Sequence, residues 1–264
     1  MSQKCQSILF DRNGRLSAHV ATLAYEFRDA RHVIPEHYHP EDQLVFASKG
    51  VMTVRTKEGI WVVPPQRAVW IPAGTPHSVA MAGPVSMRTL YLLPRLVRTL
   101  APKCFVMNVS SLLRELILHA CKFPKLDKKV PVQRRIIEII VDQLEVVHSA
   151  LLQLPHPTDS RALRVARRLV DFPADRRTLE ELCADCGASK RTIERVFVEE
   201  TGMTFAKWRQ QLRLLHALQL LASGEKVTGA ALDAGYDSPS AFTAMFRKQL
   251  GTTPGRYFGS RIDR

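Results

Sequence analysis

The sequence lacks long apolar runs and has few cysteines, and we expect no secretory leader. No stretch approaches the roughly 20 uninterrupted apolar residues that cross a bilayer, so we expect no transmembrane segment and no membrane partner. The first residues, MSQKCQSILFDRNGR, have no apolar core ahead of a small-residue cleavage site, which argues against export. Five scattered cysteines suit a reducing cytoplasm better than a disulfide framework.

The composition is that of a folded chain with a basic surface. Of the 264 residues, 45% are apolar and 24% are charged, which excludes a disordered chain and allows one large domain or two small ones. Lys and Arg outnumber Asp and Glu by 38 to 25, a net charge of +13. A polyanionic partner is therefore permitted, although net charge alone does not locate the contact surface.

Short apolar runs separated by Gly and Pro characterise the chain from about residue 8 to 93. The runs lie at 44–46, 51–54, 61–63, 68–71 and 87–91. Many short strands with such turn signals are typical of a β-sandwich or a small β-barrel. We assign residues 1–95 to this domain.

Helical periodicity replaces the strand pattern in residues 96–157. Apolar residues follow 3-4 spacing at Ile137, Ile140, Leu144, Val147, Leu151 and Leu154. The pattern is shorter than a confident coiled coil requires. The segment is either a linker through which two chains form a homodimer or a helix packed on its own β domain.

An internal repeat organises residues 158–264. A shift of 49 residues aligns Ser189 with Ser238 and Phe197 with Phe246. In each copy a short helix precedes an amphipathic helix that starts after the serine N-cap and stops near a glycine. Two such pairs predict two helix-turn-helix units. A helical bundle that never touches DNA is the alternative.

The helix between the two copies is predicted at 204–221. At 1.5 Å per residue, about 18 residues span about 27 Å. A connector of that size could hold two recognition helices about one DNA turn apart, on the order of 34 Å.

The amphipathic helix of the first copy exposes Arg191, Glu194 and Arg195 opposite its apolar stripe. Arginine can bond guanine O6 and N7 together, and glutamate can accept a hydrogen bond from cytosine N4. Ser189 and Lys190, near the helix start, are better placed for phosphate. We expect this helix to read bases.

The second copy offers smaller side chains. Its outward positions include Ser240 and Thr243, with Arg247 further along the helix. Such residues supply few directional hydrogen bonds to base edges, so this helix should mostly position the protein on phosphates.

The repeat resembles a known family. Residues 159–262 are similar to the DNA-binding domain of AraC/XylS-type transcription regulators, through LEELCADCGASKRTIERVFVEETGMTFAKWRQQLRLLHALQLL and GYDSPSAFTAMFRKQLGTTPGRYF. The resemblance implies a double-stranded DNA operator, recognition helices in adjacent major grooves, and base contacts of the second helix at Ser240, Ala241 and Ala244. It also implies dimerisation through the middle segment and makes RNA polymerase a candidate partner.

A histidine cluster is predicted in the β domain. The segments HYHPEDQ (37–43) and PAGTPH (72–77) resemble the two short motifs of the cupin fold. In a strand His37 and His39 point to one face, and Gln43 and His77 would complete the site. Imidazole suits a divalent transition metal such as Zn, Ni, Cu or Fe(II), whereas Gln43 lacks the charge of the glutamate more usual there. The alternative to metal is a pocket that hydrogen-bonds a small-molecule effector.

These observations predict an α+β protein in three parts. A cupin-like β-barrel (1–95) senses a small molecule or metal, a helical linker follows (96–157), and a C-terminal all-α domain (158–264) binds DNA through two helix-turn-helix units. We expect a cytoplasmic, sequence-specific transcription regulator without catalytic residues. The alternative, a metal-dependent cupin enzyme fused to a DNA-binding module, is disfavoured because the sequence offers no obvious acid/base pair.

Overall fold

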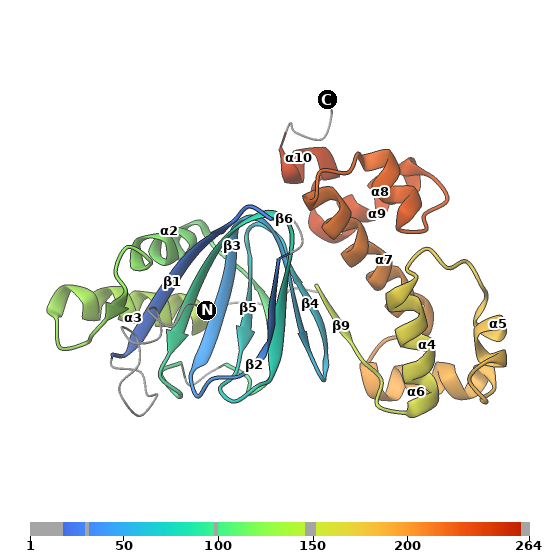
Figure 1. Ribbon diagram of the computed structural model, residues 1–264, viewed down its shortest axis with the longest axis horizontal. Helices are drawn as coiled ribbons and strands as arrows, with labels where there is room; N and C mark the ends of the chain where they lie inside the picture. Colours follow the sequence, from blue (N-terminus) through green and yellow to red (C-terminus); the bar gives the residue numbers. More distant parts are fainter. Residues whose placement is uncertain (1–17, 30–31, 98–99, 146–151, 260–264) are drawn as a thin grey trace. The chain divides into compact units, whose positions relative to one another are not determined.

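The computed structural model describes residues 18–29, 32–97, 100–145 and 152–259. The chain divides into two compact units, Met1–Thr56 with Trp61–Leu151 and Lys57–Ile60 with Leu152–Arg264. The α+β class is confirmed, because the first unit is rich in strands and the second is helical (Figure 1). In the described part of the chain, no helix is long and apolar enough to cross a membrane.

The described strands form a nine-stranded sheet in the order β7-β5-β3-β6-β1-β8, with β2 paired to β6 and β4 paired to β3 and β9. The strands are β1 (Val20–Phe27), β2 (Val33–His37), β3 (Asp42–Thr56), β4 (Gly59–Val63), β5 (Arg67–Ile71), β6 (His77–Leu92), β7 (Phe105–Asn108), β8 (Lys125–Leu126) and β9 (Gln153–Pro155). Strands β7 and β8 lie after residue 95, the predicted end of the β domain, and pair with β5 and β1. The sheet therefore extends into the segment predicted as a linker.

Strand alternation separates the two faces of this sheet. Leu44, Phe46 and Leu90 join one apolar cluster with residues of the helices. Gln43 and Tyr91, which are cross-strand partners on β3 and β6, point to the opposite face because side chains alternate along a strand. That face holds the histidine cluster.

Two helices, α2 (Ser111–Ala120) and α3 (Pro131–Glu145), cover the other face (Figure 1). The buried residues of α3 in the shared cluster are Ile137, Ile140 and Leu144. Of the two predicted roles for the middle segment, packing on its own β domain is therefore present in the structure.

The predicted continuation of this helical pattern to Leu154 is wrong. The described part of α3 ends at Glu145, and Leu154 lies in β9. Val147 and Leu151 lie outside the described residues. Periodicity alone misassigned Leu154, because β9 is a three-residue strand that forms only by pairing with β4, far away in the sequence.

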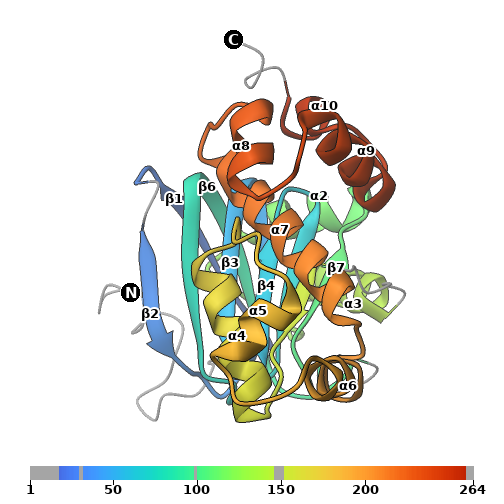
Figure 2. The ribbon, with the colours of Figure 1, turned by 90° about the vertical axis from the view of Figure 1, so that its right-hand side faces the viewer.

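The described part of the second unit contains seven helices. They are α4 (Ser160–Asp171), α5 (Leu179–Ala184), α6 (Lys190–Thr201), α7 (Phe205–Ala222), α8 (Val227–Asp233), α9 (Pro239–Leu250) and α10 (Pro254–Phe258). Figure 2 shows α7 running between the α4–α6 group and the α8–α10 group. The predicted pairs are α5 with α6 and α8 with α9, and α7 is the predicted connector.

The repeat is visible in the caps and in the core. Ser189 and Ser238 cap α6 and α9 by accepting hydrogen bonds from backbone N–H groups of the first turn. Phe197 packs on Trp208 with ring centroids 5.3 Å apart, and residues 246 and 257, each 49 positions later, pack at 5.6 Å. The serine caps and the aromatic packing thus stabilise both helix-turn-helix copies in the same way.

We expect Thr178→Ala to lower the free energy of unfolding by about 1 kcal/mol. The Thr178 hydroxyl accepts a hydrogen bond from the Glu181 N–H at 3.3 Å, and the Glu181 carboxylate accepts one from the Thr178 N–H at 2.6 Å. Thr253 is the matched control, because it is the N-cap of α10 but makes no side-chain cap hydrogen bond. Urea unfolding of both variants tests this, and equal losses would contradict it.

Candidate functional site

Three histidines lie together on the face of the sheet opposite to helices α2 and α3. His37 ends β2, His39 lies in the following loop, and His77 opens β6. Their ligand nitrogens all lie within 4.8 Å of one another. The pairing of His37 with His77 across β2 and β6 brings these two together, with ring centroids 4.4 Å apart. Cross-strand pairing assembles the cluster, rather than the shared strand face expected for His37 and His39.

Backbone carbonyls orient all three rings. Each Nδ1 lies 2.8 Å from a carbonyl oxygen, that of Pro35 for His37, Glu41 for His39 and Thr75 for His77. A carbonyl oxygen only accepts, so Nδ1 carries the proton and Nε2 keeps its lone pair. Metal-ligating histidines are held in the same way.

His77 carries the most telling atom of the cluster. Its side chain is fully buried, and its Nε2 has no hydrogen-bond partner within the described residues. Burial lowers the pKa of His77 to about 4, against the hydrogen bond to Thr75, which raises it. Burial also lowers the pKa of His39. Both rings are therefore neutral near pH 7, the form that binds metals.

Gln43 completes the cluster at the predicted position. Its Oε1 lies 3.1 Å from His39 Nε2, while its Nε2 donates to Thr89 Oγ1 at 3.0 Å. Thr89 in turn donates to the Leu44 carbonyl at 3.1 Å. With the amide in this orientation, two atoms with lone pairs face each other, an arrangement that a shared cation relieves.

Sequence reasoning missed two neighbours of the cluster. Thr89 holds Gln43, and Tyr91 packs edge-on against His39 with centroids 5.0 Å apart. Burial raises the pKa of Tyr91, so its hydroxyl stays protonated. The sequence signals them as two hydroxyl side chains within the strand-like run 87–91. They are two residues apart and therefore lie on one strand face.

The residues present fit a divalent transition metal. Ligand nitrogens around one tetrahedral zinc lie roughly 3.3 Å apart for Zn–N distances near 2.0–2.1 Å. The histidine ligand nitrogens, all within 4.8 Å of one another, lie close enough to face a single ion. Three imidazoles, with the amide oxygen of Gln43, form a donor set that borderline metals accept.

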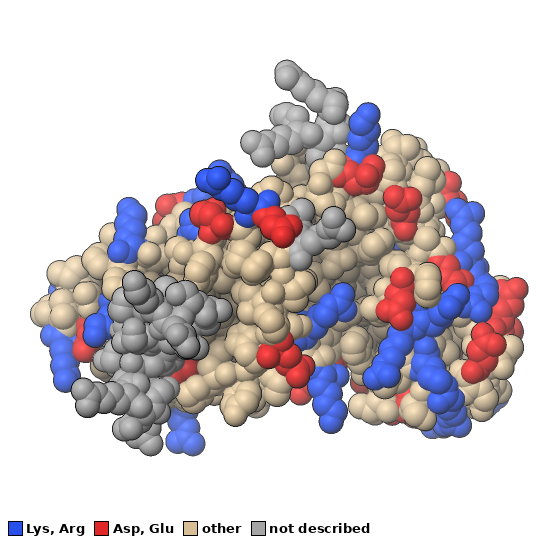
Figure 3. Space-filling model, in the orientation of Figure 1, with Lys and Arg blue, Asp and Glu red and all other residues tan. Residues whose placement is uncertain are grey.

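The second candidate site is the exposed face of α6. Arg191, Glu194 and Arg195 are all exposed, as predicted, while Ile193 and Phe197 are buried. The Lys and Arg side chains gather over the helical unit with acidic groups between them (Figure 3).

Ion pairs on this face are local and open to water. Arg195 pairs with Glu199 at 2.9 Å, and Lys190 pairs with Glu180 at 2.6 Å. The Ser189 hydroxyl caps the helix by accepting a hydrogen bond from the Thr192 N–H at 3.3 Å. Exposed ion pairs contribute little free energy, so a DNA base or phosphate can replace the acidic partner.

The corresponding face of α9 is less charged. Ser240 is exposed, Thr243 is half-buried, and Arg247 is exposed in the last turn. Ala241 and Ala244 are also exposed and carry no hydrogen-bonding side chain. The two helices therefore present different chemistry to a common partner.

Comparisons with known proteins match the strand-rich part and the helical part of the chain to two different domain families. The model of the AraC-like ligand binding domain matches residues 19–141, and that of a helix-turn-helix domain matches 182–260. The chain is 36% identical over 223 residues to the HTH-type transcriptional regulator NimR of Escherichia coli (strain K12), covering 84% of this chain and 81% of NimR.

Two further likenesses are partial or remote. The HTH-type transcriptional regulator RipA of Corynebacterium glutamicum is 36% identical over 108 residues, which cover 41% of this chain and 33% of RipA. A crystal structure of ToxT from Vibrio cholerae with a bound unsaturated fatty acid covers 90% of this chain and 94% of its own, at 12% identity and a TM-score of 0.39.

Proposed function

The chain belongs to the AraC family of transcription regulators, and from this premise we propose how its two units divide the work. A ligand-binding domain is joined to a DNA-binding helix-turn-helix domain. In our proposal α6 reads bases, α9 mainly contacts phosphates, and the histidine cluster receives the signal.

The observation that carries the DNA proposal is the contrast between α6 and α9. Arg191, Glu194 and Arg195 offer charged, directional groups, whereas Ser240 and Thr243 offer short hydroxyls. Bidentate arginine contacts discriminate between bases by about 1–3 kcal/mol each, and phosphate contacts carry no sequence information directly. Lys190, Ser189 and Arg247 then serve as phosphate contacts.

The histidine cluster is proposed to bind one divalent transition metal. The metal is either the signal itself or a part of the site that binds the effector. Burial of an unpartnered His77 Nε2, neutral rings and the facing lone pairs of His39 and Gln43 all favour a cation there. A bound metal would supply a positive charge to which the surrounding sheet can respond. A small-molecule effector that donates hydrogen bonds to the same nitrogens is the second candidate.

Further parts of the proposal concern assembly. Val132 and Ile139 are exposed apolar residues one heptad apart on α3, and they support a homodimer through this helix. RNA polymerase stays a candidate partner. We further propose that the protein acts in the cytoplasm and has no catalytic activity, since relatives such as NimR are named as transcriptional regulators.

We expect operator mutations to have unequal effects. Base substitutions under α6 should cost about 1–3 kcal/mol each, and those under α9 clearly less, because only α6 carries directional charged groups. The test is a binding scan of every base pair in a duplex that the full chain selects from random-sequence DNA. Equal penalties in both half-sites would refute the division of labour.

A further inference from the structure

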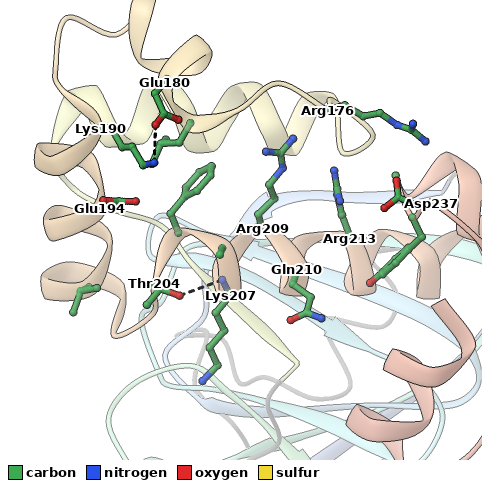
Figure 4. Close-up of a pocket in the computed structure, with 16 residues that line it drawn as sticks. Arg176, Glu180, Lys190, Glu194, Thr204, Lys207, Arg209, Gln210, Arg213 and Asp237 are labelled. Atoms are coloured by element: carbon green, nitrogen blue, oxygen red, sulfur yellow. Dashed lines mark hydrogen bonds and ion pairs between the residues drawn. The ribbon is translucent and has the colours of Figure 1, made fainter. Parts of the chain in front are cut away.

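A cleft of about 1140 Å³ separates the two helix-turn-helix units. Lys190 and Glu194 of α6 line one side, Asp237 after α8 lines the other, and Arg209 and Arg213 rise from α7 at its base (Figure 4). These two arginines point toward the loop between α4 and α5 rather than toward open solvent. Neither has a role in the DNA contacts proposed above.

Arg209 ties the connector helix to the first helix-turn-helix unit. Its guanidinium donates to the carbonyl of Arg177 at 2.6 Å and to that of Asp175. Both carbonyls belong to the loop that leads directly into α5, whose cap begins at Thr178. The position of α5, and of α6 packed against it, is therefore set partly by one side chain of α7.

Arg213 lies between the same loop and the second helix-turn-helix unit, α8 with α9. Its Nη2 donates to the Asp175 carbonyl at 3.3 Å. On its other side lies Gly235, in the turn between α8 and α9, at a φ of +83°. A Cβ added to Gly235 would lie 3.1 Å from Arg213 Nε and 3.0 Å from Ala174 Cα. The loop and the turn therefore both lie close to Arg213, with no room left for a side chain at Gly235.

The contact continues into the second recognition helix. Tyr236, next to Gly235, is buried, and its ring lies 5.1 Å from that of Phe242 on α9. Its hydroxyl donates to Met245 Sδ at 3.7 Å. A continuous chain of contacts therefore joins α5 and α6 to α9 through Arg209 and Arg213, in addition to the covalent connector.

We propose that Arg209 and Arg213 are positioning residues that fix the two recognition helices relative to each other and so set the number of base pairs between the two half-sites. The inference rests on the proposed DNA-binding function. One base pair advances the duplex by about 3.4 Å and turns it by roughly 35°. A rigid pair of units should therefore tolerate one spacing, and a loosened pair should tolerate several.

The test measures spacing preference with the full chain. A duplex selected by the wild-type chain from random-sequence DNA is remade with one base pair added to or removed from the spacer. We expect the wild type to bind the original about tenfold more tightly, since a single defect in a site typically costs roughly 5- to 150-fold. For Arg213→Met the preference should fall below about threefold, with unchanged binding to the isolated α6 half-site.

Arg176→Met is the control for charge. It removes one positive charge from the lining of the same cleft, at an exposed residue of the loop before α5, and it should keep the spacing preference (Figure 4). Arg213→Met with a wild-type preference, or with equal loss on every duplex including the half-site, overturns the inference.

Arg213→Lys decides the case if the methionine variant fails to fold. Lysine keeps the charge but lacks the planar fork that reaches both the loop and the turn, so we expect an intermediate preference. A wild-type preference in this variant overturns the inference. A wild-type chain that selects no DNA sequence overturns the proposed function itself.

Discussion

We expect the double substitution His37→Ala with His39→Ala to abolish the response of the protein to a divalent metal or effector. It removes two of the three imidazoles whose nitrogens lie within 4.8 Å of one another. Changing even an outer partner of a metal ligand costs 10–100-fold in affinity, so loss of two ligands should weaken metal binding by at least about 10²-fold. Basal DNA binding should stay nearly intact, because the helical unit has its own core of Phe197, Trp208 and Phe246.

Metal binding is measured by calorimetric titration of zinc, nickel or cobalt into the purified chain. His119→Ala is the matched control, because this exposed histidine lies on α2 outside the cluster. A double variant that keeps the full response would show that these histidines do not form the sensor site. One that loses DNA binding as well would show that the cluster supports the fold.

We expect the double substitution Arg191→Ala with Arg195→Ala to remove most of the sequence preference proposed for the protein. Both side chains are exposed on α6, and two bidentate contacts to guanine are worth about 1–3 kcal/mol each. We expect specific binding to weaken by at least about 2 kcal/mol, or roughly 30-fold, with a smaller loss on random DNA. Arg195→Ala alone should lose about 1–3 kcal/mol and relax the preference at one base pair.

Competition between selected and random duplexes measures this loss. Arg247→Ala is the contrasting variant, because a phosphate contact weakens both kinds of duplex alike and lowers the salt slope by about one. If the arginine pair behaved as Arg247 does, α6 would be a phosphate-binding helix rather than a base-reading one.

The helical unit could be predicted closely from sequence because its signals are local. Ser189 and Ser238 cap helices at the expected positions, and the capping box at Thr178 and Glu181 forms as its spacing indicates. The connector, predicted at 204–221, is α7 at Phe205–Ala222. Each of these features depends on residues within one or two helical turns.

Features made by distant segments could not be predicted in the same way. Thr89 reaches Gln43 only because β3 pairs with β6 in one register, and Leu154 leaves the helical pattern because β9 finds β4. The bonds from Arg209 and Arg213 to a loop more than 30 residues earlier left no periodic trace in the sequence. The histidine cluster was expected through its resemblance to cupin motifs, whereas its ring orientations follow from backbone carbonyls that only the fold positions.

The most direct measurement is the affinity of the full chain for its selected duplex with and without bound metal. Coupling between a signal site and a DNA site changes the dissociation constant by typically 5–150-fold, and DNA must change metal affinity by the same factor. Our account predicts such a shift for the wild type and none for the variant lacking His37 and His39. An equal shift in both proteins, or a wild-type chain that binds metal but holds DNA with unchanged affinity, would contradict it.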